Sequence, residues 1–277
     1  PATHPLIVHI ASAASLEQWA SDVPQAARTL AARFWPGPLT MILKRHARIP
    51  AIVTGGQETV GVRAPSHRLA QELLRKFAQA GSGAIAAPSA NRFGHISPTT
   101  AQHVRDEFGS ALFVLDGGAC EFGLESTIVD LSRTHPVLLR PGAVTRDDIA
   151  TALGNIPQHP DSQAPRAPGM LEAHYAPRTA LALVRASALD AELTQRANVA
   201  VLAMREAPAT ANVTFWIAAA RDPARYGRDL YANLRLLDAS GAKRILVEAP
   251  PETPLWEAVN DRLTRAAAGA GMFDDEP

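Results

Sequence analysis

The chain has 277 residues, 47% hydrophobic and 19% charged, so it is long and apolar enough for two domains with buried cores. Its 27 basic residues balance its 27 acidic ones, which excludes a global field that would draw the protein onto nucleic acid or an anionic membrane. The single cysteine, Cys120, excludes an intrachain disulfide and a thiolate-rich metal site and favours a cytoplasmic location. No apolar run reaches the roughly 20 residues of a membrane span, so we expect no membrane contact.

The first half of the chain alternates strand and helix patterns. Apolar and β-branched runs predict strands at 5–10, 39–44, 59–63, 84–87, 112–116, 126–131 and 137–140. Helical periodicity and cap residues predict a short helix opened by a capping box at Ser15 and Gln18, and further helices at 24–34, 68–80, 99–108 and 145–154. The last of these has Thr145 and Asp148 as its cap and ends at Gly154.

The regular pattern stops at Asn155, and five prolines follow by Pro177, which indicates a linker. Beyond it, strands at 181–184, 199–202, 214–217 and 245–248 alternate with helices such as 223–240 and 255–268, which predicts a parallel α/β sheet. We therefore expect a catalytic domain at 1–154, a linker or lid at 155–178 and a smaller Rossmann-like α/β domain at 179–277. The domain at 179–277 lacks a Gly-x-Gly-x-x-Gly motif after a strand, which weighs against a dinucleotide site, and its residues suggest no particular chemistry.

The stretch from Ala84 to Thr100 has the clearest features of a binding site. A strand of small apolar residues, expected to be buried, ends at Pro88, and a dense run of polar side chains follows at the carboxyl end of the strand, where α/β sheets bind ligands. Ser97 and Pro98 are typical of a helix cap and first helical position, which would direct free amides at the same place. This arrangement favours an anionic ligand.

Four further clusters place polar groups at or near predicted strand ends: His4 with His9, residues 59–67, Glu125-Ser126-Thr127, and Arg140-Pro141-Gly142. Arginines, hydroxyls, an amide and histidines are suited to hold phosphate and carboxylate groups. Paired carboxylates, metal-ligand spacing and a Gly-x-Ser-x-Gly element are missing, so chemistry would depend on positioning and charge stabilisation. Taken singly, each residue also has a structural interpretation, such as a core histidine, a helix cap or a surface ion pair.

In combination the clusters resemble the long, two-domain form of the YrdC-type threonylcarbamoyl-AMP synthases. The matching segments, in order, are 1–9, 59–67, 87–100, 125–130, 140–142 and the His-Tyr-Ala-Pro of 174–177. The resemblance covers nearly the whole chain. It implies a YrdC-like twisted mixed sheet with helices, and an enzyme that condenses L-threonine, bicarbonate and ATP into threonylcarbamoyl-AMP and pyrophosphate. That product would feed the threonylcarbamoyl modification of a tRNA adenosine by a separate transferase.

The resemblance also implies which residues bind each substrate. L-Threonine would lie against His9, Arg63, the backbone around Ala87, and Ser126. ATP, with Mg²⁺ as its accompanying ion, would lie against His4, Thr59, Ser89, Asn91, Ser97, Arg140 and Tyr175. Tyr175 would close over the nucleotide as part of a lid and exclude water from a labile carbamate and mixed anhydride.

Two departures from the family pattern bear on activity. The chain starts at Pro1, and the family's Lys-x-Arg element lies just upstream of that position, so we assign no catalytic residue and expect the 277-residue chain alone to be a poor catalyst. Residue 4, commonly asparagine in the family, is His4, a bulkier side chain that still donates to a phosphate and titrates near neutrality.

Two alternatives stay open at this point. One is an RNA-binding or translation-associated module of the same fold, with a local basic patch at Arg63, His67, Arg68, Arg75 and Lys76, although the balanced net charge weighs against it. The other is carbamoyl-adenylate chemistry on a different acceptor, which would bring cysteine-rich zinc motifs that a chain with one cysteine lacks. Whether the protein itself binds tRNA is left open as well.

Overall fold

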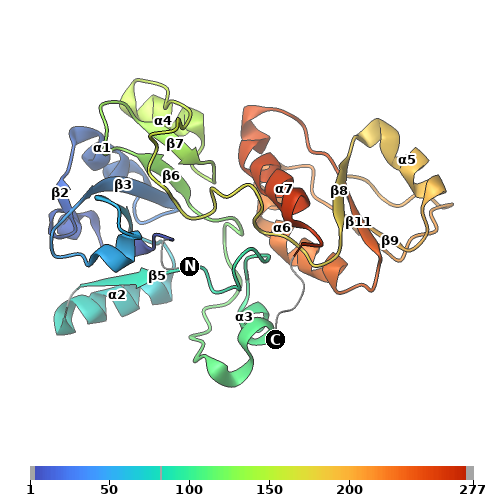
Figure 1. Cartoon of the computed structure of the whole chain (residues 1–277), viewed down its shortest axis with the longest axis horizontal. Helices are drawn as coiled ribbons and strands as arrows, with labels where there is room; N and C mark the ends of the chain where they lie inside the picture. Colours follow the sequence, from blue (N-terminus) through green and yellow to red (C-terminus); the bar gives the residue numbers. More distant parts are fainter. Residues whose placement is uncertain (1–3, 82, 273–277) are drawn as a thin grey trace. The chain divides into compact units, whose positions relative to one another are not determined.

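The computed structural model describes residues 4–81 and 83–272, which form two compact units (Figure 1). The first consists of the chain up to Pro88 together with Glu125–Met170, and the second of Ser89–Leu124 together with the chain from Leu171. This grouping by contacts differs from the predicted division by sequence, because residues 89–124 pack with C-terminal elements. Among the described residues, no helix combines the length and apolar composition that crossing a bilayer requires.

The first unit is built on a mixed sheet, as expected. Its strands are β1 (Ile7–Ile10), β2 (Ala20–Asp22), β3 (Leu39–Arg45), β4 (Thr59–Arg63), β5 (Ala84–Ala87), β6 (Thr127–Asp130) and β7 (Val137–Arg140). They run in the order β5-β1-β4-β3-β6-β7, with β2 paired to β3. The pairs β1–β4 and β3–β6 are parallel and the others antiparallel, so the sheet brings residues far apart in sequence to one surface.

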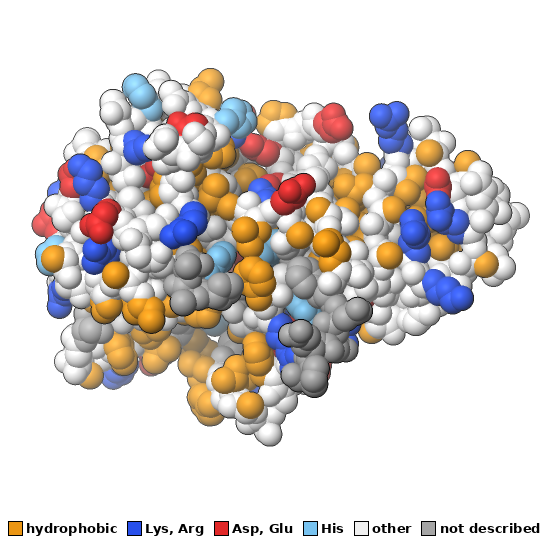
Figure 2. Space-filling view, viewed as in Figure 1, with side chains coloured by type: hydrophobic (Ala, Val, Ile, Leu, Met, Phe, Trp, Pro, Cys, Tyr) orange, Lys and Arg blue, Asp and Glu red, His pale blue; other side chains and the backbone are white. Residues whose placement is uncertain are grey.

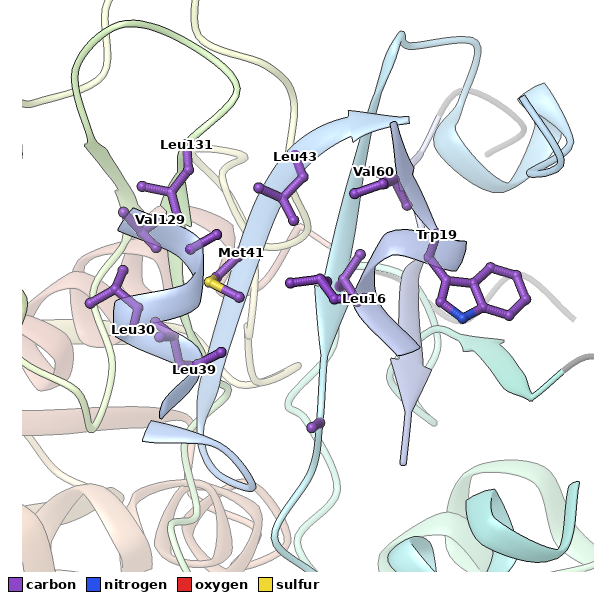
Figure 3. Packing of buried hydrophobic residues seen from close by; sticks show 14 of the residues in the cluster. Leu16, Trp19, Leu30, Leu39, Met41, Leu43, Val60, Val129 and Leu131 are labelled. Atoms are coloured by element: carbon purple, nitrogen blue, oxygen red, sulfur yellow. The ribbon is translucent and has the colours of Figure 1, made fainter. Parts of the chain in front are cut away.

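Helices cover one face of this sheet. The helices α1 (Gln25–Phe34) and α4 (Arg146–Leu153) and the 3₁₀ helix η1 (Ala13–Gln18) share one buried cluster with apolar side chains of the strands. Figure 3 shows Leu30 of α1 beside Met41 and Val129 of the sheet. Because side chains alternate along a strand, the residues between these buried positions point to the opposite face.

The remaining elements of the first unit lie around the sheet. The helix α2 (Arg68–Ala80) contacts β5, and the 3₁₀ helix η2 (Ala51–Thr54) contacts β4. The capping box of α4 is confirmed: Asp148 N donates to Thr145 Oγ1 at 3.1 Å and Thr145 N donates to Asp148 Oδ2 at 2.9 Å. Gly154 ends α4 in the left-handed conformation, with φ of 74°, as predicted.

The second unit contains a parallel sheet with both faces covered, which confirms the predicted α/β character. Its strands β8 (Leu181–Val184), β9 (Val199–Ala203), β10 (Phe215–Ala218) and β11 (Arg244–Glu248) lie in the order β10-β9-β11-β8. Figure 1 shows α5 (Ala186–Gln195) on one side of it, and α6 (Pro223–Asp238) and α7 (Glu257–Gly269) on the other. The 3₁₀ helix η4 (Pro254–Trp256) precedes α7. Two separate apolar clusters correspond to these two faces.

Polar contacts attach residues 89–124 to α6. Glu107, in α3 (Ala101–Phe108), pairs with Arg235 of α6 at 3.3 Å, and Arg235 also donates to the carbonyl of Ile96 at 2.5 Å. His95 lies 3.6 Å from the Glu107 carboxylate and forms an isolated bridge with Ala176. These contacts explain why the segment groups with the C-terminal elements rather than with its neighbours in sequence.

Two predictions within this segment are wrong. The helix does not begin at Pro98: α3 starts at Ala101, and Thr100 is its cap, with Oγ1 accepting from His103 N at 3.2 Å. Residues 112–116 form no strand and follow the 3₁₀ helix η3 (Gly109–Ala111) as irregular chain. Phe113 in that run is 94% exposed, since the run pairs with no strand that would bury its β-prone residues.

Two predictions in the first unit also need correction. The strand β5 is not buried, because it pairs with β1 alone at the end of the strand order and its residues stay partly or fully exposed. The capping box at Ser15 and Gln18 is absent: η1 begins after Ser12, and Ser15 Oγ donates back to the Ser12 carbonyl at 3.1 Å. A serine hydroxyl that bonds to a local carbonyl competes with capping.

Candidate functional site

The face of the first sheet opposite its helices carries polar residues from several strands beside a buried apolar cluster of Ile42, Ile128, Val137 and Leu139, on which Ala167 packs. Paired residues on neighbouring strands share a face, and the register pairs His9 with Arg63, Ile7 with both Gly61 and Ala87, and Ile128 with Arg140. Gly61 lies in the middle: a Cβ there would meet Ile42, Thr40 and Ile7 side chains at 3.3–3.5 Å. We call this surface the open face. It brings together all four residues predicted for threonine: His9, Arg63, Ala87 and Ser126.

His9 and Arg63 are paired at one end of the open face, and Arg63 supplies the positive charge there. Arg63 ends β4 and is held by a hydrogen bond from Nε to the Gly37 carbonyl at 3.1 Å, while Gly37 N donates to the Ala64 carbonyl at 2.8 Å. Burial, together with the positive charge of Arg63, lowers the pKa of His9 to about 4. His9 is therefore neutral near pH 7. Its buried Nδ1 makes no hydrogen bond within the described part of the chain, so the imidazole is available to a polar ligand.

Glycine 37 is required for this arrangement. A Cβ at position 37 would lie 2.1 Å from the carbonyl oxygen of Phe34, a distance that no side chain tolerates. Only glycine therefore lets the chain turn closely enough after α1 to present its carbonyl to Arg63. The Trp-Pro-Gly-Pro run of residues 35–38 is the sequence signal of this turn, because it cannot continue a helix.

Ser126 lies in a second, buried part of the open face. Its Oγ is 2.7 Å from Thr40 Oγ1 and 3.3 Å from Arg140 Nη2. Arg140, only 4% exposed, donates from Nε and Nη2 to the Ser126 carbonyl at 3.1 and 2.9 Å, and from Nη1 to the Pro168 carbonyl at 2.9 Å. The guanidinium therefore fixes the turn that carries Ser126 and holds the following segment against it.

Gly142 explains the Arg-Pro-Gly motif. A Cβ at this position would lie 2.6 Å from Thr127 N and 2.9 Å from the Glu125 carbonyl oxygen. Thr127 Oγ1 in turn donates to the Val144 carbonyl at 2.7 Å and accepts from Val144 N at 3.0 Å. The two sequence clusters at 125–127 and 140–142 are thus one packed structure around Ser126. Its further member Thr40 was missed, because only the register of β3 with β6 reveals it.

His4 and Thr59 lie toward the other end of the strands. Thr59 begins β4 and is opposite Lys44, four residues before Arg63, which corresponds to about 13 Å along a strand. Burial is the main reason that the pKa of His4 is lowered, and the charge of Arg166 adds to it. Both residues belong to the first unit, and their contact with ATP stays a prediction.

The other residues predicted for ATP belong to the second unit: Ser89, Asn91, Ser97 and Tyr175. Asn91 Nδ2 donates to the carbonyls of Arg92 and His95 at 2.8 and 3.2 Å and so stabilises its own loop. Ser97 is buried, and Ser89 is exposed. Their roles toward a nucleotide remain predictions.

Tyr175 is packed into the core of the second unit. The side chain is 1% exposed, with its ring 5.5 Å from that of Tyr231 and 5.2 Å from Arg262 Cζ. The backbone is left-handed, with φ of 62°, a conformation that costs a non-glycine residue about 1–3 kcal/mol. Ala176 N donates to the Gly94 carbonyl at 2.8 Å and anchors the segment. In this structure the ring is thus used for packing within its own unit.

The described residues contain no group of three or more His, Cys, Asp or Glu side chains placed to hold a metal ion. The residues predicted for the two substrates also include no carboxylate, the ligand that Mg²⁺ prefers. On the face that Figure 2 shows, Lys and Arg side chains lie in several separate groups with acidic and neutral side chains between them. The open face is therefore a candidate site for a small polar substrate.

Comparisons with known proteins identify the family. The family described as "Telomere recombination" matches residues 1–142, and "Threonylcarbamoyl-AMP synthase, C-terminal domain" matches residues 144–268. The threonylcarbamoyl-AMP synthase of Pyrococcus abyssi is 37% identical over 282 residues, which cover 96% of this chain and 81% of that protein. The chain belongs to the threonylcarbamoyl-AMP synthase family. The Bacillus subtilis enzyme of the same name is 38% identical over 287 residues, covering 97% of this chain and 81% of that one.

Solved structures agree with this assignment. The crystal structure of P. abyssi Sua5 complexed with L-threonine matches with a TM-score of 0.85 and 36% identity, covering 97% of this chain and 82% of that one. A variant of P. abyssi Sua5, in which a histidine and the tyrosine after it are replaced by alanine, matches with a TM-score of 0.86 and 35% identity over 97% of this chain and 80% of that one. The predicted family, fold and enzyme class, a nucleotidyltransferase-type synthase, are confirmed.

Proposed function

We propose that the protein condenses L-threonine, bicarbonate and ATP into threonylcarbamoyl-AMP and pyrophosphate, using the open face as its threonine site. The observation that supports this most directly is the convergence of His9, Arg63, Ala87 and Ser126 on one sheet face in a chain that belongs to the threonylcarbamoyl-AMP synthase family. The reaction joins three small polar molecules, so positioning is the main task of the protein.

In this proposal each residue of the open face has a defined role toward threonine. The Arg63 guanidinium, oriented by Gly37, binds the α-carboxylate in a fork of two parallel hydrogen bonds. His9 stays neutral because its pKa is lowered to about 4, so it hydrogen-bonds the substrate without adding a second charge beside Arg63. Ser126, held by Thr40 and Arg140, offers its hydroxyl to a polar substrate group. Arg140 is then a positioning residue.

The proposed chemistry balances in two steps. The threonine nitrogen adds to the carbon of bicarbonate, with loss of water and a proton, and gives a carbamate. A carbamate oxygen then attacks the α-phosphorus of ATP, and the bond from that phosphorus to the oxygen bridging to the β-phosphate breaks, releasing pyrophosphate. Fixed donors such as the Arg63 guanidinium hold the carboxylate so that the carbamate faces the phosphorus.

ATP binding by His4, Thr59, Ser89, Asn91, Ser97 and Tyr175 is part of the same proposal, and Arg140, predicted to contact ATP, acts in it by holding Ser126 and Pro168. Because these residues supply no carboxylate, we expect Mg²⁺ to be held by the triphosphate and water rather than by the protein, and no step depends on a protein-bound ion. We further propose that the product is passed to a separate transferase for tRNA modification and that the protein is cytoplasmic, as its single cysteine suggests.

The test is pyrophosphate release by the purified protein with ATP and bicarbonate. We expect release to depend on L-threonine and to fall sharply with L-alanine, which lacks the hydroxyl. Arg63→Gln should raise the KM for threonine by about 10- to 100-fold through loss of a charge-assisted contact. Arg75→Gln, an exposed arginine of α2 away from the open face, is the matched control and should behave as wild type. Threonine-independent release, or equal KM values in both variants, would contradict the proposal.

A further inference from the structure

The second unit has a cavity at the carboxyl edge of its parallel sheet. It has a volume of about 420 Å³, and its walls come from the residues after β9, the end of β10 with the residues that follow it, and one stripe of α6. A space of this size suits a small metabolite. All of its lining residues belong to the second unit and none is among the residues assigned to threonine or ATP.

The topology of the sheet explains why a cavity forms there. After β9 the chain crosses toward the α5 side, where Val213 packs beside the cluster that contains Leu189. After the neighbouring strand β10 it crosses to the other side as α6. The chain thus leaves two adjacent parallel strands in opposite directions, and open α/β sheets bind ligands in the crevice that such a divergence creates.

The edge below the cavity is fixed by buried polar groups. Glu248, at the end of β11, is 7% exposed and accepts a hydrogen bond from Met204 N at 2.8 Å. Arg205, on the cavity wall, pairs with Asp190 and stacks on Trp216, with Cζ 5.6 Å from the ring. The charge of Arg205 is therefore already neutralised, and the backbone after β9 is held in place.

Two other arginines give the cavity a positive end. Arg221 donates from Nε to the Met204 carbonyl at 2.9 Å, which orients the guanidinium and leaves its terminal nitrogens available. The side chain of Arg225, in the first turn of α6, makes no hydrogen bond to any other described residue. Asp229 and Asn233 follow at intervals of four residues on the same stripe of α6, and Glu206 is a second carboxylate of the lining. The Asp229 carboxylate accepts from Arg228 at 2.8 and 3.2 Å, which fixes it, and together these side chains give the cavity an end that can bind hydroxyl groups.

We propose that this cavity binds a small phosphorylated metabolite of the sugar phosphate class. The phosphate would lie between Arg221 and Arg225, and the hydroxyl groups would lie against Asp229 and Asn233. Two guanidinium groups in the lining of one cavity match the double negative charge of a phosphate monoester better than the single charge of a carboxylate. The site would give the C-terminal domain a ligand of its own, separate from the substrates of the synthase reaction.

Calorimetric titration of the purified protein with ribose 5-phosphate and with inorganic phosphate tests this. We expect one ribose 5-phosphate per chain and weaker binding of inorganic phosphate. Arg225→Gln should weaken the binding of both compounds by about tenfold or more, since each phosphate group loses a charge-assisted contact. Asn233→Ala should weaken the binding of ribose 5-phosphate, which has hydroxyl groups, and leave the binding of inorganic phosphate unchanged. Arg196→Gln, a surface arginine of the same unit outside the cavity, is the control and should have no effect.

Other results would overturn the proposal. One is that neither ribose 5-phosphate nor inorganic phosphate binds saturably. Another is that the wild type and Arg225→Gln bind them with equal affinity, and a third is that Arg196→Gln loses as much affinity as Arg225→Gln. Loss of L-threonine binding in Arg225→Gln would reassign the cavity to a carboxylate. Because Arg225 is exposed, we expect its substitution to leave both the fold and threonine-dependent pyrophosphate release unchanged, so failure here is distinguishable from failure of the synthase proposal.

Discussion

The two sheets of this protein differ in how many of their faces are covered. Helices cover one face of the first sheet, and the other presents His9, Arg63 and Thr40 around Gly61. The second sheet has helices on both faces, so its central strand β9 is apolar and buried throughout, while its outer strands β8 and β10 keep partly exposed residues. Strand alternation therefore gives the first unit a sheet face with polar residues for substrates beside a covered apolar cluster, whereas the second unit offers a cavity at its carboxyl edge.

The largest expected effect on stability is in the covered sheet. Leu202, in β9, is fully buried between the sheet and α6, and Leu202→Ala should lower the free energy of unfolding by about 2–5 kcal/mol. Leu183→Ala, in β8 of the same sheet, removes a side chain that is 36% exposed and should cost less. Urea denaturation measures both. The register pairs both leucines with Val247, so they share one face, and equal losses would mean that Leu202 is not buried against α6 as described.

His9, on the open face, should make the free energy of unfolding depend on pH. The pKa of His9 is lowered from 6.5 to about 4 in the folded state by burial and Arg63, so the unfolded chain binds more protons between these values. The contribution of His9 to the free energy of unfolding is therefore fully present above pH 6.5. It declines as the pH falls toward 4, by up to about 3 kcal/mol. His9→Gln should remove that part of the slope when both proteins are denatured at several pH values. An unchanged slope would mean that His9 is not a buried neutral residue.

A smaller effect is expected at the packed turn beneath Ser126. Gly142→Ala places a Cβ against the backbone of Thr127 and Glu125, and this overpacking should cost about 1–3 kcal/mol. Gly61→Ala, on the same face, meets only side-chain atoms, the nearest at 3.3 Å, and should be milder. Thermal melts compare the two variants. A larger loss for Gly61→Ala would contradict the account of why the Arg-Pro-Gly motif needs its glycine.

Local sequence signals predicted most of the elements but few of the contacts. The strand 59–63 and the helix 68–80 have the predicted bounds, because alternation and periodicity act over neighbouring residues. The cap predicted at Ser97 is wrong because Thr100, three residues later, caps α3 instead. The strand predicted at 112–116 is wrong because propensity cannot show whether a partner strand exists.

The candidate site was predicted through family resemblance more than through spacing. His9 and Arg63 are far apart in sequence, and only the parallel register of β1 and β4 makes them neighbours. Thr40 and Gly142 were not assigned a role, since their contacts with Ser126 and Thr127 are tertiary. The burial of Tyr175 against Tyr231 is likewise a long-range contact that the linker composition did not indicate.

The most direct test of the open face as the threonine site is a crystal structure of the protein with L-threonine. We expect the α-carboxylate to accept two hydrogen bonds from the Arg63 guanidinium at about 2.7–2.9 Å, with His9 and Ser126 in contact with the remaining polar groups. Threonine bound elsewhere on the protein, with Arg63 and His9 free of it, would contradict the central claim.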